Sequence, residues 1–260
     1  MVEARDVSYV VGGSQILDGV TARFQRNRFN VILGSNGAGK STLLKIATGL
    51  VAPTHGDVFY EDQPLSELPH DAIARRRGVL SQQVDLAFPL SVREVVLMGR
   101  YPHYAQRPSA RDLQIVGDAI ALVGLSSKSD QPYPTLSGGE RQKTQLARVL
   151  AQIWDAAERD EGRYLFLDEP TSGLDVRYEI HILDVARGLL RDCTVIAVMH
   201  DLNVALQYGD AFFFLQRGRL VHQTDDRDDI SRELIERVFD VRAHQMIDPE
   251  DSRSFWRFSL

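Results

Sequence analysis

The chain has 260 residues, of which 43% are hydrophobic and 25% are charged, the composition of an ordinary soluble protein. Its 36 acidic residues outnumber its 30 basic ones, and the resulting net charge of −6 argues against nucleic-acid binding over the whole surface, which needs a basic domain. The single cysteine, Cys193, excludes a disulfide framework or a cysteine-based zinc site within one chain, and we expect it to be a small buried hydrophobic residue.

The sequence has no segment that is typical of membrane insertion. Its apolar runs, such as residues 119–125, are far shorter than the ~20 residues that cross a bilayer. The first residues carry Glu3 and Asp6 and lack the apolar stretch of a signal peptide. We therefore expect the chain in the cytoplasm, with a separate anchor if it works at a membrane.

The first part of the chain predicts short strands that lead into a glycine-rich loop. Residues 1–11 alternate roughly between apolar and polar side chains, Gly12 and Gly13 mark a turn, and a second strand is predicted over 15–24. Residues 29–33 are a short apolar run that enters the loop GSNGAGKST, after which apolar residues recur at helical spacing. The order of strand, glycine-rich loop and helix is typical of a phosphate-binding site.

The remainder predicts a β portion, a helical insertion and a buried parallel sheet. Residues 56–65 favour a turn-linked β segment. From about 85 to 160 the apolar residues follow a helical period, which we interpret as an inserted helical subdomain. The continuous apolar runs 164–167 and 194–198 indicate parallel strands with both sheet faces covered. A hairpin over 211–223 and a polar helical tail complete the predicted elements.

Residues 34–41 match the pattern G-x-x-x-x-G-K-[ST] in full. Its glycines let backbone N–H groups converge on phosphate oxygens, and the start of the next helix adds partial positive charge. Lys40 would reach the β- and γ-phosphates, and the Ser41 hydroxyl would bind Mg²⁺. An ordinary glycine turn is the alternative, which the position between a strand and a helix disfavours. The predicted ATP-binding residues here are Gly34, Ser35, Asn36, Gly37, Ala38, Gly39, Lys40, Ser41 and Thr42.

A second motif is the apolar strand YLFLDEP, which ends in two carboxylates at Asp168 and Glu169. Ligands of open α/β sheets bind at this end of the strands. Asp168 would hold Mg²⁺ through water, and Glu169 would polarise the attacking water. The alternative is a strand that happens to end in a solvated acidic turn, and the phosphate-binding loop in the same chain disfavours it.

The segment LSGGE precedes a predicted helix with an apolar face. Ser137 and Glu140 fit the S-x-x-E capping box, so a purely structural interpretation is strong here. Both interpretations can hold, because the N–H groups that need a cap also form an anion site suited to a γ-phosphate.

Taken in chain order, these motifs resemble the ATP-binding subunit of an ABC transporter. GSNGAGKST resembles its Walker A motif, LSGGE its signature motif, YLFLDEP its Walker B motif with the catalytic glutamate, and SGLD its D-loop, which ends at Asp175. Gln82 and His200 fall at the places of the Q-loop glutamine and the switch histidine. The resemblance covers residues 1–260 as a single nucleotide-binding domain. It implies an α/β P-loop NTPase fold with a parallel-sheet core, an antiparallel β subdomain and an inserted helical subdomain near 85–160.

The resemblance also implies a mechanism and partners. Catalytic roles would fall to Glu169, His200 and Gln82, and Mg²⁺ would be held by Ser41, Gln82 and Asp168. The P-loop of one copy and Ser137, Gly138, Gly139, Glu140 and Asp175 of a second copy would enclose ATP in a head-to-tail homodimer. The dimer would bind a pair of membrane-spanning permease subunits at the cytoplasmic face of the inner membrane, as a peripheral protein. A periplasmic substrate-binding protein would be an indirect partner, and nucleic acid would not be one.

A finer resemblance concerns the transported substrate. Residues 96–103 are similar to the V-x-x-G-R-x-P-H segment of ATPases that energise import of iron-siderophores, haem and cobalamin. The extension over 154–163 resembles the haem importers of that group. We therefore expect haem (hemin) import, with a siderophore or cobalamin importer, or a soluble non-transport ABC ATPase, as the alternatives. A single P-loop and the lack of sustained heptads disfavour the soluble ATPases, and an intact Glu169 and His200 disfavour a non-catalytic binding module.

Two further expectations concern aromatic residues. Haem ligation by Tyr101, His103 and Tyr104 is conceivable, since His and Tyr bind haem iron, but a surface loop packed at a subunit interface suits these residues better. Val11 occupies the place where the family usually has an aromatic that stacks on adenine. Tyr9 would share its face if the strand is regular, and we expect Tyr9 to pack in the sheet instead.

Overall fold

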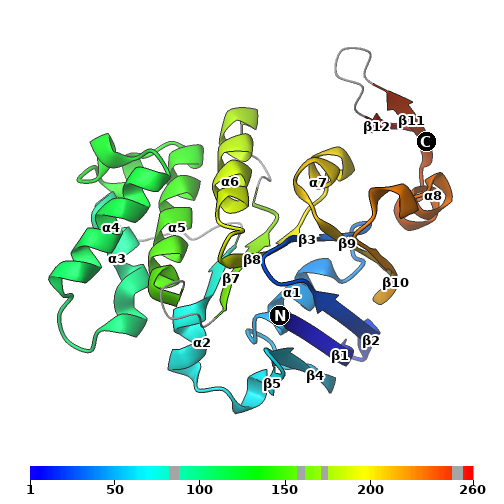
Figure 1. Ribbon diagram of the computed structural model, residues 1–260, viewed down its shortest axis with the longest axis horizontal. Coiled ribbons are helices and arrows are strands. Elements are labelled where there is room, and N and C mark those ends of the chain that lie inside the picture. The colour runs from blue at the N-terminus through cyan, green and yellow to red at the C-terminus, as the bar shows by residue number, and fades with distance from the viewer. Residues whose placement is uncertain (82–87, 157–161, 171–174, 248–253, 260) are drawn as a thin grey trace. The chain divides into compact units, whose positions relative to one another are not determined.

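The structure is a computed structural model that describes residues 1–81, 88–156, 162–170, 175–247 and 254–259 (Figure 1). The chain is divided into two compact units. One comprises Met1–Ser66 together with Ile196–Leu260, and the other comprises Glu67–Val195. Cys193 is fully buried, as we expected, and burial raises the pKa of its thiol to about 12. Within the described ranges, every helix is too short or too polar to cross a bilayer.

The first unit contains an antiparallel sheet with the strand order β2-β1-β4-β5. Its strands are β1 (Val2–Val11), β2 (Ser14–Phe24), β4 (His55–Tyr60) and β5 (Gln63–Pro64). Gly12 and Gly13 form the β1–β2 turn with φ values of +56° and +78°, which a tight hairpin requires at both central residues. The predicted antiparallel β portion is thereby confirmed.

Strand β1 continues to Val11, and its register with β2 shifts on both sides of Tyr9. In both shifts the extra residue belongs to β2, so the alternation of side chains along β1 from Tyr9 to Val11 is not interrupted. Tyr9 pairs with Leu17 and is half-buried, whereas Val11 is 52% exposed beside the turn. That Tyr9 packs in the sheet rather than contacting adenine stays a prediction.

A second group of strands in this unit forms the support for the phosphate-binding loop. Strand β3 (Phe29–Leu33) is buried throughout and pairs in parallel with β9 (Ala211–Gln216), which pairs antiparallel with β10 (Arg219–Thr224). The predicted hairpin at 211–223 is confirmed. The helical elements of the unit are α1 (Lys40–Ala47), η1 (Leu65–Glu67, which ends in the other unit), α7 (Leu202–Tyr208), η6 (Arg227–Asp229) and α8 (Arg232–Phe239).

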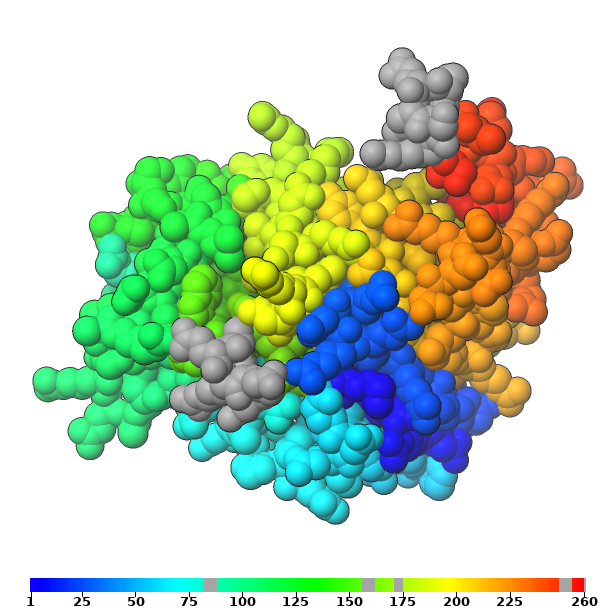
Figure 2. Space-filling model, viewed as in Figure 1, coloured from blue at the N-terminus to red at the C-terminus, as the bar shows by residue number. Residues whose placement is uncertain are grey.

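The predicted helical tail is only partly right. After α8 the chain forms β11 (Arg242–Ile247) and β12 (Ser254–Ser259), an antiparallel pair that lies beside α7 and α8 (Figure 1). In the space-filling view, the orange side chains of α8 adjoin the red ones of the hairpin (Figure 2). Each strand of this pair buries one side chain, Ala243 in β11 and Trp256 in β12, and its other residues are exposed.

The second unit combines parallel strands with most of the helices. Strand β6 (Arg77–Leu80) pairs in parallel with β7 (Arg163–Asp168), and β8 (Cys193–Val198) begins here and ends in the first unit. Helices α3 (Val92–Leu97), α4 (Ala110–Leu122) and α5 (Gly138–Gln152) lie side by side (Figure 1). The other helical elements are α2 (His70–Arg76), η2 (Met98–His103), η3 (Ser126–Lys128), η4 (Tyr133–Thr135), η5 (Trp154–Ala156) and α6 (Val176–Gly188).

Helices α3 and α4 begin where their sequences indicate. Ser91 and Ser109 each accept a hydrogen bond from a backbone N–H three residues later, and the acidic side chain at that position accepts one from the backbone N–H of the serine, which completes two capping boxes. Helices α3, α4 and α5 fall within the segment near 85–160 that we expected to be helical, but the unit itself is broader and also includes α2, α6, β6 and β7. The limits of a separate helical subdomain stay a prediction.

Candidate functional site

The loop between β3 and α1 has a backbone that only glycine can supply at two positions. Gly34 has φ +152°, and a Cβ there would lie 2.2 Å from the backbone oxygen of Leu215. Gly39 has φ +97°, and a Cβ there would lie 2.9 Å from the backbone oxygen of Ile16. The two glycines allow the loop to pack against neighbouring backbone and turn sharply into α1.

Lys40 is held at this loop with its ammonium group turned back over it. The side chain is buried, and Nζ donates hydrogen bonds to the backbone oxygens of Gly34 (2.9 Å) and Ser35 (3.1 Å). No side chain caps the start of α1, whose N-cap is Gly39. A buried cation and an uncapped helix start together favour an anionic ligand such as phosphate.

The other residues of the predicted loop differ in exposure. Asn36 and Gly37 are exposed at its tip, and Ala38 is buried. Ser41 and Thr42 lie half-buried in the first turn of α1. The Ser41 hydroxyl therefore lies within one helical turn of the loop, where a phosphate-bound cation would find an oxygen donor.

His200 belongs to the same unit as the loop. It follows the end of β8 and is exposed. The next residue, Asp201, caps α7 by accepting hydrogen bonds from the N–H groups of Asn203 (2.8 Å) and Val204 (3.1 Å). This cap fixes the backbone directly after His200.

Asp168 and Glu169 lie at the carboxyl end of β7 in the second unit. The five preceding residues of the strand are buried, and both carboxyl-bearing residues are half-buried. Glu169 has φ +50°, a left-handed conformation that is uncommon for a residue with a side chain. Such strained positions concentrate at functional sites, which supports a special role for this carboxylate.

The signature segment begins helix α5, and its capping box is confirmed. Ser137 Oγ accepts from the N–H of Glu140 at 3.3 Å, and Glu140 Oε2 accepts from the N–H of Ser137 at 3.0 Å. Ser137 and Gly138 are exposed, whereas Gly139 is buried. The exposed first turn leaves the helix start accessible to a ligand from outside the unit.

Some predicted residues lie outside the part of the chain that the structure describes: Gln82, the D-loop residues 172–174, and residues 157–161 of the extension. Asp175, which ends the D-loop, is the N-cap of α6 and accepts a hydrogen bond from the N–H of Arg177 at 2.9 Å. The structure thus places the P-loop and His200 in one unit, and Asp168, Glu169, the signature residues and Asp175 in the other.

A family model described as ABC transporter matches residues 17–172 of the chain. The chain belongs to the ABC transporter family. Hemin import ATP-binding proteins HmuV are similar over most of their length. The protein from Mesorhizobium japonicum is 39% identical over 98% of this chain and 97% of its own, and that from Gloeobacter violaceus is 44% identical over 85% and 80%. The Escherichia coli O157:H7 protein is 35% identical over 96% of both chains.

Solved structures confirm the ABC ATPase fold that the motifs predict. A chain described as a metal-chelate type ABC transporter in an inward-facing conformation aligns with a TM-score of 0.82, over 99% of this chain and 96% of its own, at 22% identity. A dimeric bacterial ABC transporter cassette aligns with a TM-score of 0.73, over 86% of this chain and 98% of its own, at 25% identity. The same cassette bound to ADP and Pi aligns with a TM-score of 0.71, at 26% identity.

The structure of this ABC ATPase adds two contacts at the signature helix that sequence reasoning missed. Lys128 of η3 forms an ion pair with Glu140, its Nζ lying 2.5 Å from Oε1. The pKa of Glu140 lies below its usual value because Lys128 and the N–H of Ser137 both donate to the carboxylate. Lys128 ends η3, and nothing in its local sequence points to Glu140.

The second contact comes from helix α6. A Cβ on Gly139 would lie 2.4 Å from Cγ of Tyr178, so the aromatic ring fills the space that a side chain would need. Lys143 Nζ lies 5.2 Å from the centroid of the same ring. Tyr178 follows Asp175 by one helical turn, and it therefore joins the end of the D-loop to the signature helix.

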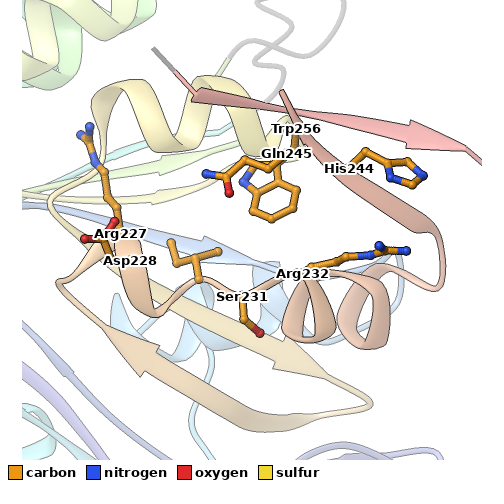
Figure 3. A pocket seen from close by; sticks show the side chains of 8 residues that line it. Arg227, Asp228, Ser231, Arg232, His244, Gln245 and Trp256 are labelled. Carbon is orange, nitrogen blue, oxygen red and sulfur yellow. The ribbon is translucent and has the colours of Figure 1, made fainter. Parts of the chain in front are cut away.

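A separate cavity lies under the C-terminal hairpin (Figure 3). It has a volume of about 430 Å³ and is lined by Arg227, Asp228, Ile230, Ser231, Arg232, His244, Gln245 and Trp256. In the close-up, Trp256 and Gln245 lie together on the hairpin side of this cavity (Figure 3). None of the predicted nucleotide-binding residues lines it.

Proposed function

We propose that the chain is the ATP-hydrolysing subunit that energises haem import across the inner membrane. The observation that carries this proposal is the likeness to the hemin import ATP-binding proteins, at 39% identity over 98% of this chain for the Mesorhizobium japonicum relative. The complete series of nucleotide motifs along the chain supports an active ATPase. The protein would work peripherally, at the cytoplasmic face of the membrane.

Each motif residue has a part in the proposed reaction, the attack of water on the γ-phosphate. The N–H groups of the loop 34–42 and the ammonium of Lys40 would bind the phosphates and neutralise their charge. Glu169 would accept a proton from the attacking water, and His200 and Gln82 would contact the γ-phosphate. Positioning and charge neutralisation would supply most of the rate enhancement.

Mg²⁺ fits the donor set that these residues offer. The Ser41 hydroxyl and the Asp168 carboxylate are hard oxygen donors, and both are half-buried at the ends of their elements. Together with Gln82 they would hold the cation. When bound, the cation would neutralise charge on the β- and γ-phosphates.

The proposed assembly is a head-to-tail homodimer. Ser137, Gly138, Gly139, Glu140 and Asp175 of one copy would complete the ATP site on the P-loop of the other. The exposed start of α5 supports this arrangement, because its capped first turn is free to meet a second chain. A pair of membrane-spanning permease subunits and, indirectly, a periplasmic substrate-binding protein would complete the importer.

The test is growth of cells that lack this chain. We expect no growth on haem as the sole iron source, unchanged growth on simple iron salts, and rescue by the wild-type chain. The Glu169→Gln chain, present at the same level, should not rescue growth. Unimpaired growth on haem together with lost siderophore or cobalamin use would assign the chain to the iron-siderophore or cobalamin importers. The chain resembles their V-x-x-G-R-x-P-H segment as well.

A further inference from the structure

The segment that resembles V-x-x-G-R-x-P-H packs directly on the far end of the signature helix. Residues 98–103 form η2, and Gly99 lies against the backbone of α5. A Cβ on Gly99 would lie 2.0 Å from the backbone oxygen of Arg148 and 3.3 Å from the backbone nitrogen of Gln152. Any side chain at this position would push η2 away from the helix.

Arg100 is the centre of this contact. Its side chain is only 2% exposed, and it donates in three directions. Nε lies 2.9 Å from Asp112 Oδ1, Nη1 lies 2.7 Å from the backbone oxygen of Ala151, and Nη2 lies 2.5 Å from Asp155 Oδ2. A planar guanidinium can make all these bonds at once, whereas a lysine ammonium cannot reproduce their geometry.

His103 adds a second contact at the same end of α5. Its side chain is 6% exposed, with Nε2 2.7 Å from the backbone oxygen of Gln152 and Nδ1 3.4 Å from Asp155 Oδ2. Because a carbonyl oxygen only accepts, Nε2 carries a proton. Burial lowers the pKa of His103. The surface loop that we expected at 101–104 is therefore wrong for His103, although Tyr101 is 61% exposed.

The two acidic residues tie this contact to the rest of the unit. Asp112 also accepts hydrogen bonds from Ser109 and so belongs to the cap of α4. Asp155 Oδ1 accepts from Arg111 Nη2 at 3.1 Å. We call Arg100, His103, Asp112 and Asp155 the α5 clamp, because they fix the last turn of α5 to η2, η5 and α4.

The clamp acts on a helix whose other end is the signature motif. Arg100 and His103 donate to the carbonyls of Ala151 and Gln152, groups that a helix end otherwise leaves without partners. Helix α5 has 15 residues, so it is ~22 Å long, and a tilt of ~5° about its clamped end would move the first turn by ~2 Å. A displacement of ~1 Å can cost about 100-fold in rate where groups must meet a reacting phosphate.

We propose that the α5 clamp positions the signature motif: Arg100, His103 and Asp155 are positioning residues that act on ATP hydrolysis through the direction of α5. This inference rests on the proposed function only in that Ser137 to Glu140 meet ATP. It does not depend on which substrate is imported. The buried cluster then gives the G-R-x-P-H segment a mechanical role distinct from contact with any ligand.

The test separates kcat from ATP binding in the purified full chain. Arg100→Lys keeps the positive charge but loses the planar guanidinium that makes the three hydrogen bonds. Asp155→Asn keeps the size of the side chain but removes its negative charge. Both variants should lower kcat for ATP hydrolysis by about tenfold or more and leave the Kd for ATP within about twofold, because the P-loop is in the other unit. Asp192→Asn, which breaks the Arg163–Asp192 ion pair of the same unit, is the matched control for destabilisation.

A merely structural cluster would give a different result. Folded Arg100→Lys and Asp155→Asn chains with wild-type kcat would overturn the proposal, as would an equal fall in kcat for Asp192→Asn at matched stability. If one clamp variant fails to fold, His103→Gln provides a further variant at the carbonyl of Gln152. The haem assignment fails separately, since it is measured by growth and uptake, and the clamp is measured by hydrolysis in the purified chain.

Discussion

Replacing Gly39 by alanine should destabilise the chain far more than the same replacement at Gly37. Both glycines have positive φ, +97° and +76°, which an alanine adopts at a cost of ~1–2 kcal/mol. Only at Gly39 would the new methyl group meet packed atoms, at 2.7 Å from Leu17 Cδ2 and 2.9 Å from the backbone oxygen of Ile16. No atom of the residues that the structure describes lies within 4 Å of a Cβ on Gly37, which makes Gly37→Ala the matched control.

The magnitude follows from these two effects. Overpacking a filled site costs ~1–3 kcal/mol in addition to the backbone strain, so Gly39→Ala should lower the free energy of unfolding by ~2–5 kcal/mol. Gly37→Ala should lower it by only ~1–2 kcal/mol. The backbone oxygen of Ile16 cannot rotate away from the new methyl group, which favours the upper part of the range for Gly39→Ala.

The assay is denaturant unfolding of the full chain without nucleotide, at one temperature for both variants. ATP binding provides a second readout, because Gly37 is exposed at the tip of the loop where the phosphates would lie. Gly37→Ala should therefore weaken ATP binding although it destabilises the fold less than Gly39→Ala does. Equal destabilisation by the two substitutions would refute the description of the loop as packed on one side and open at its tip.

The remaining predictions concern nucleotide chemistry. Lys40→Ala should weaken ATP binding, whereas Glu169→Gln should bind ATP and fail to hydrolyse it; wild-type hydrolysis by Glu169→Gln would contradict the assignment of that carboxylate. Tyr178→Ala should lower kcat without changing the Kd for ATP, while Tyr178→Phe, which keeps the ring against Gly139, should hydrolyse ATP normally; equal effects of both would exclude a packing role. Val11→Tyr should tighten ATP binding, since an exposed position beside the turn leaves room for a ring and stacking is worth ~1–3 kcal/mol. A large loss of ATP affinity in a folded Tyr9→Ala chain would instead make Tyr9 the adenine contact.

Motifs that act through the local backbone could be predicted from the sequence. The P-loop is such a case, because its glycine spacing alone dictates the turn from β3 into α1. The capping box of Ser137 and Glu140 is another, since both partners lie within one helical turn. The acidic end of β7 was predictable because a continuous apolar run ended there.

Contacts between distant residues were not predictable in this way. Lys128 reaches the signature helix from η3 through its ion pair with Glu140, and Tyr178 reaches it from α6, which packs on α5. In the α5 clamp, Arg100 pairs with Asp155, although helices α4 and α5 lie between the two residues in the sequence. The local sequence, an arginine followed by a proline and a histidine, gives no sign of this partner. The C-terminal hairpin was missed because apolar and polar residues do not alternate along its short strands, each of which buries only one side chain, that of Ala243 or Trp256.

The most direct measurement of the central claim is the initial rate of uptake of isotopically labelled haem by cells whose only copy of this chain is wild type or Glu169→Gln. We predict ATP-dependent haem uptake with the wild-type chain and its loss with Glu169→Gln at equal expression, while iron-siderophore and cobalamin uptake stay the same in both strains. Haem uptake that is equal in the two strains, or a loss confined to siderophore or cobalamin uptake, would contradict the account.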